Sequence, residues 1–184
     1  MPRLYGKSIV LREYRWEDLD GIRGWVNDSE VTQFLSGLFL YPHTLHQSES
    51  YLSMMIENKS EARGFVIADK DTLEYIGQID LIKVDWVSRK ATLGIVIGRK
   101  ELHGKGIGTE AIKLLLGFAF NQLNLNKVDL TVRDYNKRGI RCYEKCGFVE
   151  EGRLREDYYI NGEYTDTVLM GCLKRDFMLL DITK

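Results

Sequence analysis

The chain has 184 residues, of which 44% are hydrophobic and 29% are charged, an ordinary balance for a soluble globular protein. Its formal net charge is −1, so the molecule as a whole has no electrostatic attraction to nucleic acid or to an anionic membrane, and neither partner is expected. No apolar run approaches the roughly 20 residues that cross a bilayer, and no signal-peptide pattern is present. We therefore predict one domain over residues 1–184, located in the cytoplasm.

The three cysteines, Cys142, Cys146 and Cys172, are an odd number without a secretory signal. This argues against a disulfide framework and favours reduced thiols. Cys142 and Cys146 are four residues apart and would share one face of a helix. No further Cys or His lies near them in sequence to complete a metal site, so no metal is predicted.

In the N-terminal part of the chain, a mixture of β-branched and polar residues over 7–14 predicts a first strand. A helix is expected over 16–26, because acidic residues are favourable in a first helical turn. An irregular stretch, 27–44, follows. Thr44 would cap a second helix over 45–58.

Three strands are expected next, over 64–69, 75–86 and 91–98. The last has a nearly continuous apolar core, as a central strand does. A glycine-punctuated loop then leads into a helix over 108–123. Four apolar residues recur at helical spacing and would face the sheet: Ile107, Ala111, Leu115 and Phe118.

The chain then predicts a strand over 127–133 and a helix over 136–146 that Gly147 ends. Strands over 148–158 and 163–173 surround Asn161-Gly162, a strong type I′ hairpin signal. The element order predicts an α/β (α+β) fold with a single mixed, mostly antiparallel central sheet of about seven strands flanked by about four helices. Three antiparallel strands would be followed by a βαβ unit and a hairpin.

A glycine-rich segment, His103-Gly104-Lys105-Gly106-Ile107-Gly108-Thr109, joins the central strand to the helix after it. Glycines let successive backbone N–H groups turn toward one point, and the helix N-terminus adds partial positive charge, which suits a pyrophosphate. The simpler alternative is a glycine-rich turn without a ligand. The Walker pattern would need Lys directly before Thr109, and the dinucleotide fingerprint would need Gly in place of Thr109.

A second motif runs from Asn136 to Phe148 as NKRGIRCYEKCGF. Asn136 and Tyr143 are seven residues apart, just under two helical turns, so they point the same way. The simpler alternative makes Asn136 only a helix N-cap and Tyr143 only a core aromatic residue. The cap is compatible with a ligand-binding role.

These two segments resemble the GNAT acetyltransferases, whose motifs read [QR]-x-x-G-x-[GA] and N-x-x-[AS]-x-x-x-[YF]-x-x-x-G-F. Gly106 and Gly108 occupy the small positions of the first motif, and His103 stands in place of Gln or Arg. Gly139 replaces Ala or Ser in the second. The resemblance extends over about 8–174. It is strongest to the branch that holds bacterial ribosomal-protein N-terminal acetyltransferases and spermidine acetyltransferases.

The resemblance implies an acetyl-CoA-dependent N-acetyltransferase in which a primary amine attacks the thioester directly in a ternary complex. Acetyl-CoA would lie between strands 91–98 and 127–133, which splay apart, and Tyr143 would protonate the leaving thiolate. The residues expected to bind the cosubstrate are Ile95, Val96, Ile97, His103, Gly104, Lys105, Gly106, Ile107, Gly108, Thr109 and Asn136.

The attacking amine must lose a proton, because a lysine-like amine has a pKa of about 10.4. Many relatives carry Glu just after the Ala of the central strand, but here Ala91 is followed by Thr92, which cannot act as a base. Four carboxylates are candidates, directly or through water: Glu30, Asp80, Asp85 and Glu156. Asp80 stands out because it interrupts an apolar strand.

The acceptor is expected to be a protein N-terminal α-amine, with a polyamine or an amino sugar as alternatives. Five carboxylates could attract a polycation or be ordinary surface charge: Asp28, Glu30, Glu150, Glu151 and Glu156. An acyl-CoA-binding regulatory module without turnover is the non-catalytic alternative, and homo-oligomerisation is left open. Retention of Tyr143 together with the whole glycine-rich loop favours an enzyme.

Overall fold

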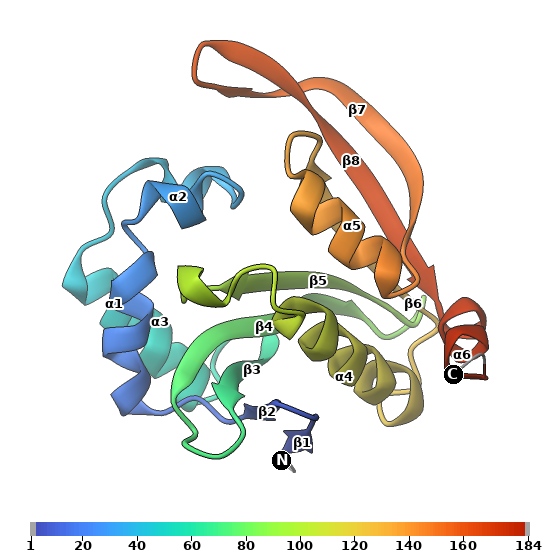
Figure 1. The fold of residues 1–184 in the computed structure, drawn as a ribbon, viewed down its shortest axis with the longest axis horizontal. Helices are drawn as coiled ribbons and strands as arrows, with labels where there is room; N and C mark the ends of the chain where they lie inside the picture. Colours follow the sequence, from blue (N-terminus) through green and yellow to red (C-terminus); the bar gives the residue numbers. More distant parts are fainter. Residues whose placement is uncertain (1–2, 183–184) are drawn as a thin grey trace.

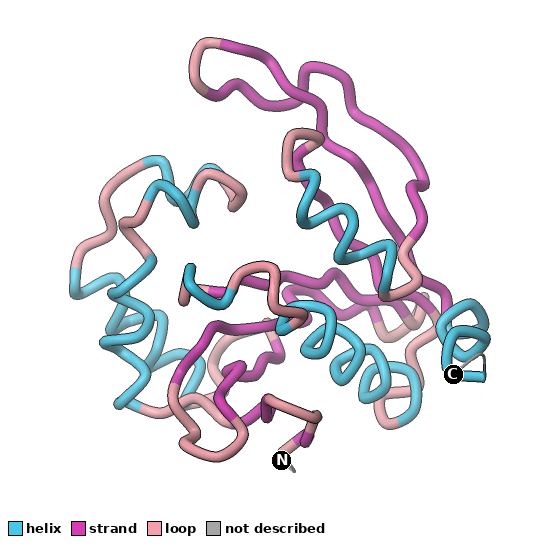
Figure 2. Tube along the Cα trace, viewed as in Figure 1, coloured by secondary structure: helices cyan, strands magenta, loops and turns pink. Residues whose placement is uncertain are grey.

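The computed structural model describes residues 3–182, which form an eight-stranded sheet with helices around it (Figures 1 and 2). The strands are β1 (Leu4–Tyr5), β2 (Ile9–Arg12), β3 (Arg63–Asp69), β4 (Tyr75–Asp85), β5 (Lys90–Ile97), β6 (Lys127–Arg133), β7 (Val149–Ile160) and β8 (Glu163–Leu173). Their order in the sheet is β1-β2-β3-β4-β5-β6-β8-β7. Among the strand pairs of residues 3–182, only β5–β6 is parallel, so the predicted mixed, mostly antiparallel sheet is confirmed.

The helices are α1 (Leu19–Trp25), α2 (Ser29–Thr32), α3 (Leu45–Ile56), α4 (Ile107–Asn121), α5 (Lys137–Lys145) and α6 (Lys174–Ile182). Short 3₁₀ turns occur at η1 (Trp16–Asp18), η2 (Gly37–Leu40) and η3 (Lys100–Leu102). Within residues 3–182, no helix is both long enough and apolar enough to span a membrane.

Three details differ from the sequence-based expectation. The strand expected over 7–14 is divided into β1 and the shorter β2, because Gly6 N–H bonds to Ile9 O at 2.9 Å and turns the chain between them. The stretch 27–44 contains the four-residue helix α2, whose first turn is capped by the Asp28 side chain. Helix α6 follows β8 directly and was not expected. The counts of strands and helices are therefore higher than about seven and about four.

Both faces of the sheet carry a hydrophobic core, and alternate residues of β2 divide between them. Ile9 and Leu11 belong to the core that α4 covers, whereas Val10 belongs to the core beneath α1 and α3. Figure 1 shows α1 and α3 together on one side and α4 apart from them. Ala111 and Leu115 of α4 are fully buried, as its apolar spacing predicted.

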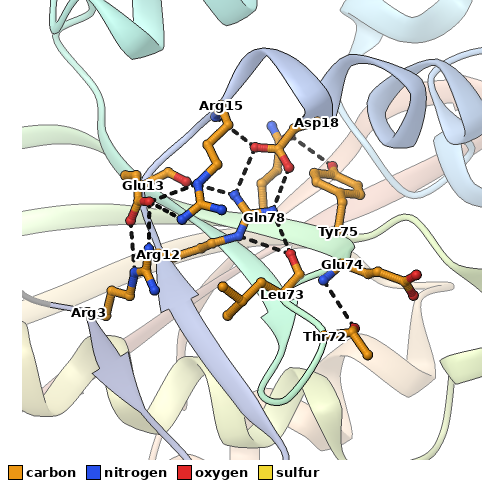
Figure 3. Close-up of polar contacts among 10 residues, drawn as sticks. All are labelled: Arg3, Arg12, Glu13, Arg15, Asp18, Thr72, Leu73, Glu74, Tyr75 and Gln78. Atoms are coloured by element: carbon orange, nitrogen blue, oxygen red, sulfur yellow. Dashed lines mark hydrogen bonds and ion pairs between the residues drawn. The ribbon is translucent and has the colours of Figure 1, made fainter.

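A buried ion pair fixes the chain just after β2. Arg12 donates to both carboxylate oxygens of Asp18 at 2.9 and 2.6 Å and to Leu73 O at 2.9 Å (Figure 3). Both charged side chains are almost fully buried. These contacts tie β2 to the start of α1 and to the β3–β4 turn, and they determine where Tyr14 enters the molecule.

The C-terminal hairpin of β7 and β8 extends away from the body of the molecule and lies beside α5 (Figure 1). At its tip, Asn161 and Gly162 have φ angles of 52° and 87°, which confirms the predicted type I′ turn. Gly147, with φ of 95°, ends α5 as predicted. The hairpin and α5 together form the second side of the site described below.

Candidate active site

The site begins where two neighbouring parallel strands separate. Strands β5 and β6 are paired only over Lys90–Thr92 and Lys127–Asp129. At the last pair, Thr92 Oγ1 donates a hydrogen bond to Asp129 Oδ1 at 2.7 Å. Beyond it, the edge of β5 that faces β6 has no strand partner in the described part of the chain. The strands therefore splay apart as expected, and this edge of residues 93–96 is free to pair with a ligand.

A cavity of about 380 Å³ occupies this fork. Most of the residues expected at the site line it: Ile95, Val96, Ile97, His103, Gly104, Gly106, Ile107, Gly108, Thr109, Asn136 and Tyr143. Lys105 does not line it. Its side chain is exposed, and its backbone N–H is directed toward Leu102 O at 3.4 Å. The glycine-rich loop and the second motif, 30 residues apart in sequence, thus meet across one cavity.

The cavity end of α4 presents unpaired backbone donors. Gly106 precedes the helix with a φ of 85°, and the first helical bond runs from Glu110 N–H to Gly106 O at 3.0 Å. The N–H groups of Ile107, Gly108 and Thr109 therefore have no partner inside the helix. They lie at the positive end of the helix dipole, an arrangement that suits a phosphate.

His103 holds the wall of the cavity together. Its Nε2 donates to Ile97 O at 2.8 Å, and its Nδ1 accepts from Arg138 Nη1 at 3.1 Å, since the guanidinium can only donate. The ring thereby connects the glycine-rich loop, the end of β5 and α5. Arg138 and Arg141 also line the cavity and add positive charge to it, a contribution that the sequence motifs did not predict.

The segment around α2 reaches across the open end of the fork. Phe34 lies with its ring 6.0 Å from that of Tyr135, and the Tyr135 hydroxyl donates to Gln33 O at 2.6 Å. Val31, Phe34 and Leu35 line the cavity from this side. Sequence reasoning missed these residues because the stretch 27–44 carries no diagnostic pattern.

Tyr143 is partly buried, and its ring packs edge-on against Phe148 at 5.9 Å. None of the described residues hydrogen-bonds its hydroxyl, and Tyr143 is one of the residues that line the cavity. Burial raises the pKa of Tyr143 above its ordinary value, so the phenol remains protonated at neutral pH. A protonated hydroxyl of a cavity-lining residue can donate a hydrogen bond to a bound group.

Asn136 has the predicted cap role as well as a place in the cavity. Its Oδ1 accepts from Gly139 N–H at 2.9 Å. A Cβ on Gly139 would lie 2.6 Å from Asn136 Nδ2. Glycine therefore avoids a clash with the capping side chain at the position where the GNAT motif has Ala or Ser. The cap and the departure from the motif are two parts of one local packing arrangement.

Three of the four carboxylates considered as bases are in unsuitable places. Glu30 pairs with Lys100 at 2.8 Å. Asp85 accepts from the N–H groups of the turn after β4. Glu156 lies in the hairpin, where it is exposed. None of the three lines the cavity.

Asp80 does not line the cavity either, but its environment differs from that of the other three. It is half-buried in β4, and burial raises its pKa from 3.8 to about 7, an effect that a hydrogen bond from the Tyr14 hydroxyl partly offsets. In the sheet register it stands between Gly64 on β3 and Gly94 on β5. Val96, which lines the cavity, follows Gly94 by two residues and so shares its face of β5. Asp80 is therefore one strand away from the cavity, across a glycine.

The surface carboxylates considered for polycation binding are mostly neutralised already. Asp28 and Glu30 both pair with Lys100 at 2.8 Å. Glu151 pairs with Lys127 at 2.6 Å, and Glu150 pairs with Arg153 at 3.4 Å. Surface charge at these residues therefore gives little support to any particular acceptor.

This fold and site define an enzyme class that binds a phosphate-bearing acyl donor in a forked sheet, and comparison with known proteins gives the family. Residues 8–149 match the family described as acetyltransferase (GNAT) domain. The chain belongs to the GNAT acetyltransferases and is an acetyl-CoA-dependent N-acetyltransferase, as its two motifs predicted.

Three similar proteins illustrate the range of relatives. The chain is 33% identical over 172 residues to a spermidine N(1)-acetyltransferase of Vibrio cholerae, covering 93% of this chain and 96% of the relative. The crystal structure of spermidine N-acetyltransferase from Vibrio cholerae in complex with CoA and spermine matches with a TM-score of 0.80 and 30% identity, over 93% of this chain and 98% of that one. A putative ribosomal N-acetyltransferase of Bacillus subtilis is 41% identical over 101 residues, 55% of each chain.

Proposed function

We propose that this enzyme acetylates a primary amine of a spermidine-like polyamine by direct attack on acetyl-CoA in a ternary complex. The forked cavity, with free amides at one end and Tyr143 in its lining, is the observation that supports this chemistry. The polyamine is preferred over a protein N-terminus because the spermidine-acetylating relatives match along nearly their whole length. The ribosomal relative matches along about half.

Each part of the cavity suits one part of the cosubstrate. The free N–H groups of Ile107, Gly108 and Thr109 would hold the pyrophosphate, with Arg138 and Arg141 supplying charge. The unpaired edge of β5 would bond to the pantetheine arm as a neighbouring strand does. This arrangement would direct the thioester into the fork, toward Tyr143.

Asp80 would take the first proton. A polyamine nitrogen arrives as an ammonium group with a pKa of about 10.4, and only the neutral amine can attack. A carboxylate whose pKa is about 7 instead of 3.8 is a stronger base by about 3 pKa units, or roughly 4 kcal/mol. Transfer from the ammonium group to Asp80 Oδ2 then yields a neutral amine and a neutral carboxylic acid.

Tyr143 would act on the departing sulfur. When the amine nitrogen bonds to the carbonyl carbon and the carbon–sulfur bond breaks, negative charge develops on sulfur. The Tyr143 hydroxyl can donate a hydrogen bond to it. Because the pKa of Tyr143 exceeds that of a thiol, about 8.5, complete transfer from tyrosine is uphill. A balanced relay avoids this cost: as the hydroxyl proton moves to sulfur, the second proton of the acetylated nitrogen replaces it on the Tyr143 oxygen. The products are then the amide, the free thiol and an unchanged phenol.

The test is an acceptor panel with the full chain and acetyl-CoA: spermidine, spermine, a peptide with a free N-terminus and an aminoglycoside. Acetylated products should be measured by mass spectrometry, because a thiol-reactive dye would also label the partly exposed Cys142. We expect kcat/KM for spermidine to exceed that for the peptide at least tenfold. Acetylation of the peptide alone would transfer the proposal to protein N-termini. CoA binding without any product would favour the regulatory module.

A further inference from the structure

Asp80 occupies a position where the sheet makes space for it. Its register neighbours are Gly64 and Gly94, so neither adjacent strand places a side chain directly beside it. A Cβ built on Gly64 would lie 1.6 Å from Asp80 Oδ1. One on Gly94 would meet Ile82 Cδ1 at 2.7 Å, a side chain that is half-exposed. Gly64 is therefore the neighbour whose lack of a side chain leaves room for Asp80.

One hydrogen bond orients the Asp80 carboxylate. The Tyr14 hydroxyl donates to Oδ1 at 2.8 Å, and no charged side chain in the described residues pairs with Asp80. Tyr14 enters from the connection between β2 and η1, which the Arg12–Asp18 ion pair holds in place (Figure 3). Because Tyr14 occupies Oδ1, Oδ2 is the oxygen left to accept a proton from a substrate.

Tyr14 is itself held by a series of polar groups. Its oxygen lies 3.3 Å from the Tyr51 hydroxyl of α3, and Gln78 Nε2 donates to Tyr51 at 2.7 Å. Tyr75 donates to Gln78 Oε1 at 3.1 Å (Figure 3), and Trp25 Nε1 donates to Tyr75 at 2.9 Å. Gln78 donates an amide hydrogen to Tyr51, and Tyr14 donates its hydroxyl hydrogen to Asp80. The contact between the two tyrosines must therefore use the hydroxyl hydrogen of Tyr51, which points to Tyr14. Every donor in the series then points toward Asp80.

Because all hydrogen bonds in the series donate in the same direction, each hydroxyl group has a single low-energy orientation. Its members come from α1, α3, the β2–η1 connection and β4, which are the elements packed against this face, and β3 and β5 contribute only the two glycines. Asp80 is the only member of the series that carries charge at neutral pH, since burial raises the pKa values of Tyr14, Tyr51 and Tyr75.

We infer that Tyr14 is a positioning residue for the base: through its hydrogen bond to Oδ1, and supported by Tyr51, it fixes the Asp80 carboxylate with Oδ2 directed to the acceptor amine. This rests on the proposed role of Asp80. Tyr14 itself contacts neither the thioester nor the amine. Its hydroxyl lowers the pKa that burial raises, so it also determines the pH at which Asp80 becomes available.

The experiment compares Tyr14→Phe with the parent and with Tyr41→Phe, a control at a tyrosine that is 80% exposed. We expect the acidic limb of the kcat/KM–pH profile, near pH 7 in the parent, to move to higher pH in Tyr14→Phe. In Tyr14→Phe we expect kcat at pH 7 to fall at least fivefold, while KM for acetyl-CoA stays at the parental value. Tyr41→Phe should have the parental kcat, KM and pH profile. Melting temperature is recorded for each variant. If Tyr14→Phe does not fold, Tyr51→Phe is used, and a smaller shift of the same sign is expected.

A second measurement separates this inference from the role of Asp80 itself. The pKa of Asp80 can be read by carboxyl ¹³C NMR without any turnover, and it should rise in Tyr14→Phe. If Asp80→Asn retains the parent rate and acidic limb, Asp80 is not the base, and the inference fails with it. If Asp80→Asn removes the limb but Tyr14→Phe behaves as the parent in both assays, only the positioning role of Tyr14 is overturned.

Discussion

Gly106 and Gly162 have almost the same backbone conformation, with φ angles of 85° and 87°, although one borders the cavity and the other turns the distal hairpin. A Cβ at either position would meet no atom within 4 Å, so only the conformation requires glycine. Replacing either residue by Ala should therefore cost a similar amount of stability, about 1–2 kcal/mol.

The two variants should differ in CoA binding. Gly106→Ala distorts the entrance to α4 that orients the free amides, whereas Gly162→Ala alters a turn that does not line the cavity. Calorimetric titration with CoA should show at least fivefold weaker binding for Gly106→Ala and parental affinity for Gly162→Ala. Equal affinities in two folded variants would mean that this loop does not hold the pyrophosphate.

Tyr143→Phe should affect turnover and little else. None of the described residues hydrogen-bonds the hydroxyl, so its removal leaves the packing against Phe148 and the melting temperature nearly unchanged. Acid catalysis typically contributes about 10²–10⁴-fold, and we expect a loss in kcat of at least tenfold, with water replacing part of the effect. Tyr159→Phe, at a tyrosine in β7 that is 57% exposed, is the control. A less stable Tyr143→Phe protein with the parental rate per folded molecule would assign Tyr143 to packing.

Asp80 should make folding stability depend on pH. Its pKa is about 7 in the folded protein and near 3.9 in an unfolded chain, so between these values the folded state binds more protons. Stability at this site is therefore highest below about pH 4 and falls as the pH rises through 7. Asp80→Asn removes this dependence and should be more stable than the parent by about 2–4 kcal/mol at pH 8 but not at pH 4.

Denaturant unfolding of Asp80→Asn and the parent at both pH values measures this difference. Other titrating groups cancel in the comparison, since both proteins contain them. If the difference in free energy of unfolding between the two proteins is the same at both pH values, Asp80 does not titrate near pH 7. The expected gain in stability with loss of activity is typical of a base kept in an unfavourable environment.

Cys142 should be the reactive thiol of the protein. It lines the cavity and lies 3.4 Å from Thr109 Oγ1. The neighbouring thiol of Cys146 lowers the pKa of Cys142, with Lys145 and Arg138 contributing, while the pKa values of Cys146 and Cys172 are raised. Iodoacetamide at pH 7 should therefore modify Cys142 first, as read by peptide mass spectrometry.

Saturating CoA should slow this modification at least tenfold if the cosubstrate occupies the cavity, and Cys142→Ser should remove the rapid phase altogether. Modification of Cys172 before Cys142 would contradict the prediction. Equal rates with and without CoA would instead show that CoA does not cover this wall of the cavity.

Local signals predicted much of the fold because they act over a few residues. The Asn161-Gly162 turn, the Thr44 cap and the glycines before α4 form the structures that their chemistry favours. Helix α6 was missed because its place depends on a distant contact, in which Phe177 packs against Phe120 of α4 at 5.5 Å. No pattern within residues 174–182 reveals that partner.

The same limit applies to the residues of the site. Gly106, Asn136 and Tyr143 belong to motifs whose spacing is fixed within one loop or one helix. Tyr14 and Tyr51, in contrast, reach Asp80 from residues 66 and 29 positions away in sequence. Sheet register and the packing of α3 bring them together, and a single tyrosine in a connection carries no sign of this. Asp80 was noticeable only because a carboxylate interrupts an apolar strand.

The parallel contact between β5 and β6 has a mechanical consequence. Within the described residues, the seam between β1–β5 and the unit of β6, β8 and β7 is short: β5 and β6 pair over three residues, next to the Thr92–Asp129 hydrogen bond and the bonds from Asn126 and Lys127 N–H to Arg89 O. This seam can open without breaking any antiparallel ladder, so amide protons beside it should exchange with solvent faster than those in β3 or β4. A ligand bound in the fork would contact both parts of the sheet and so restrict their relative motion. Filling the cavity would therefore slow amide exchange along the seam.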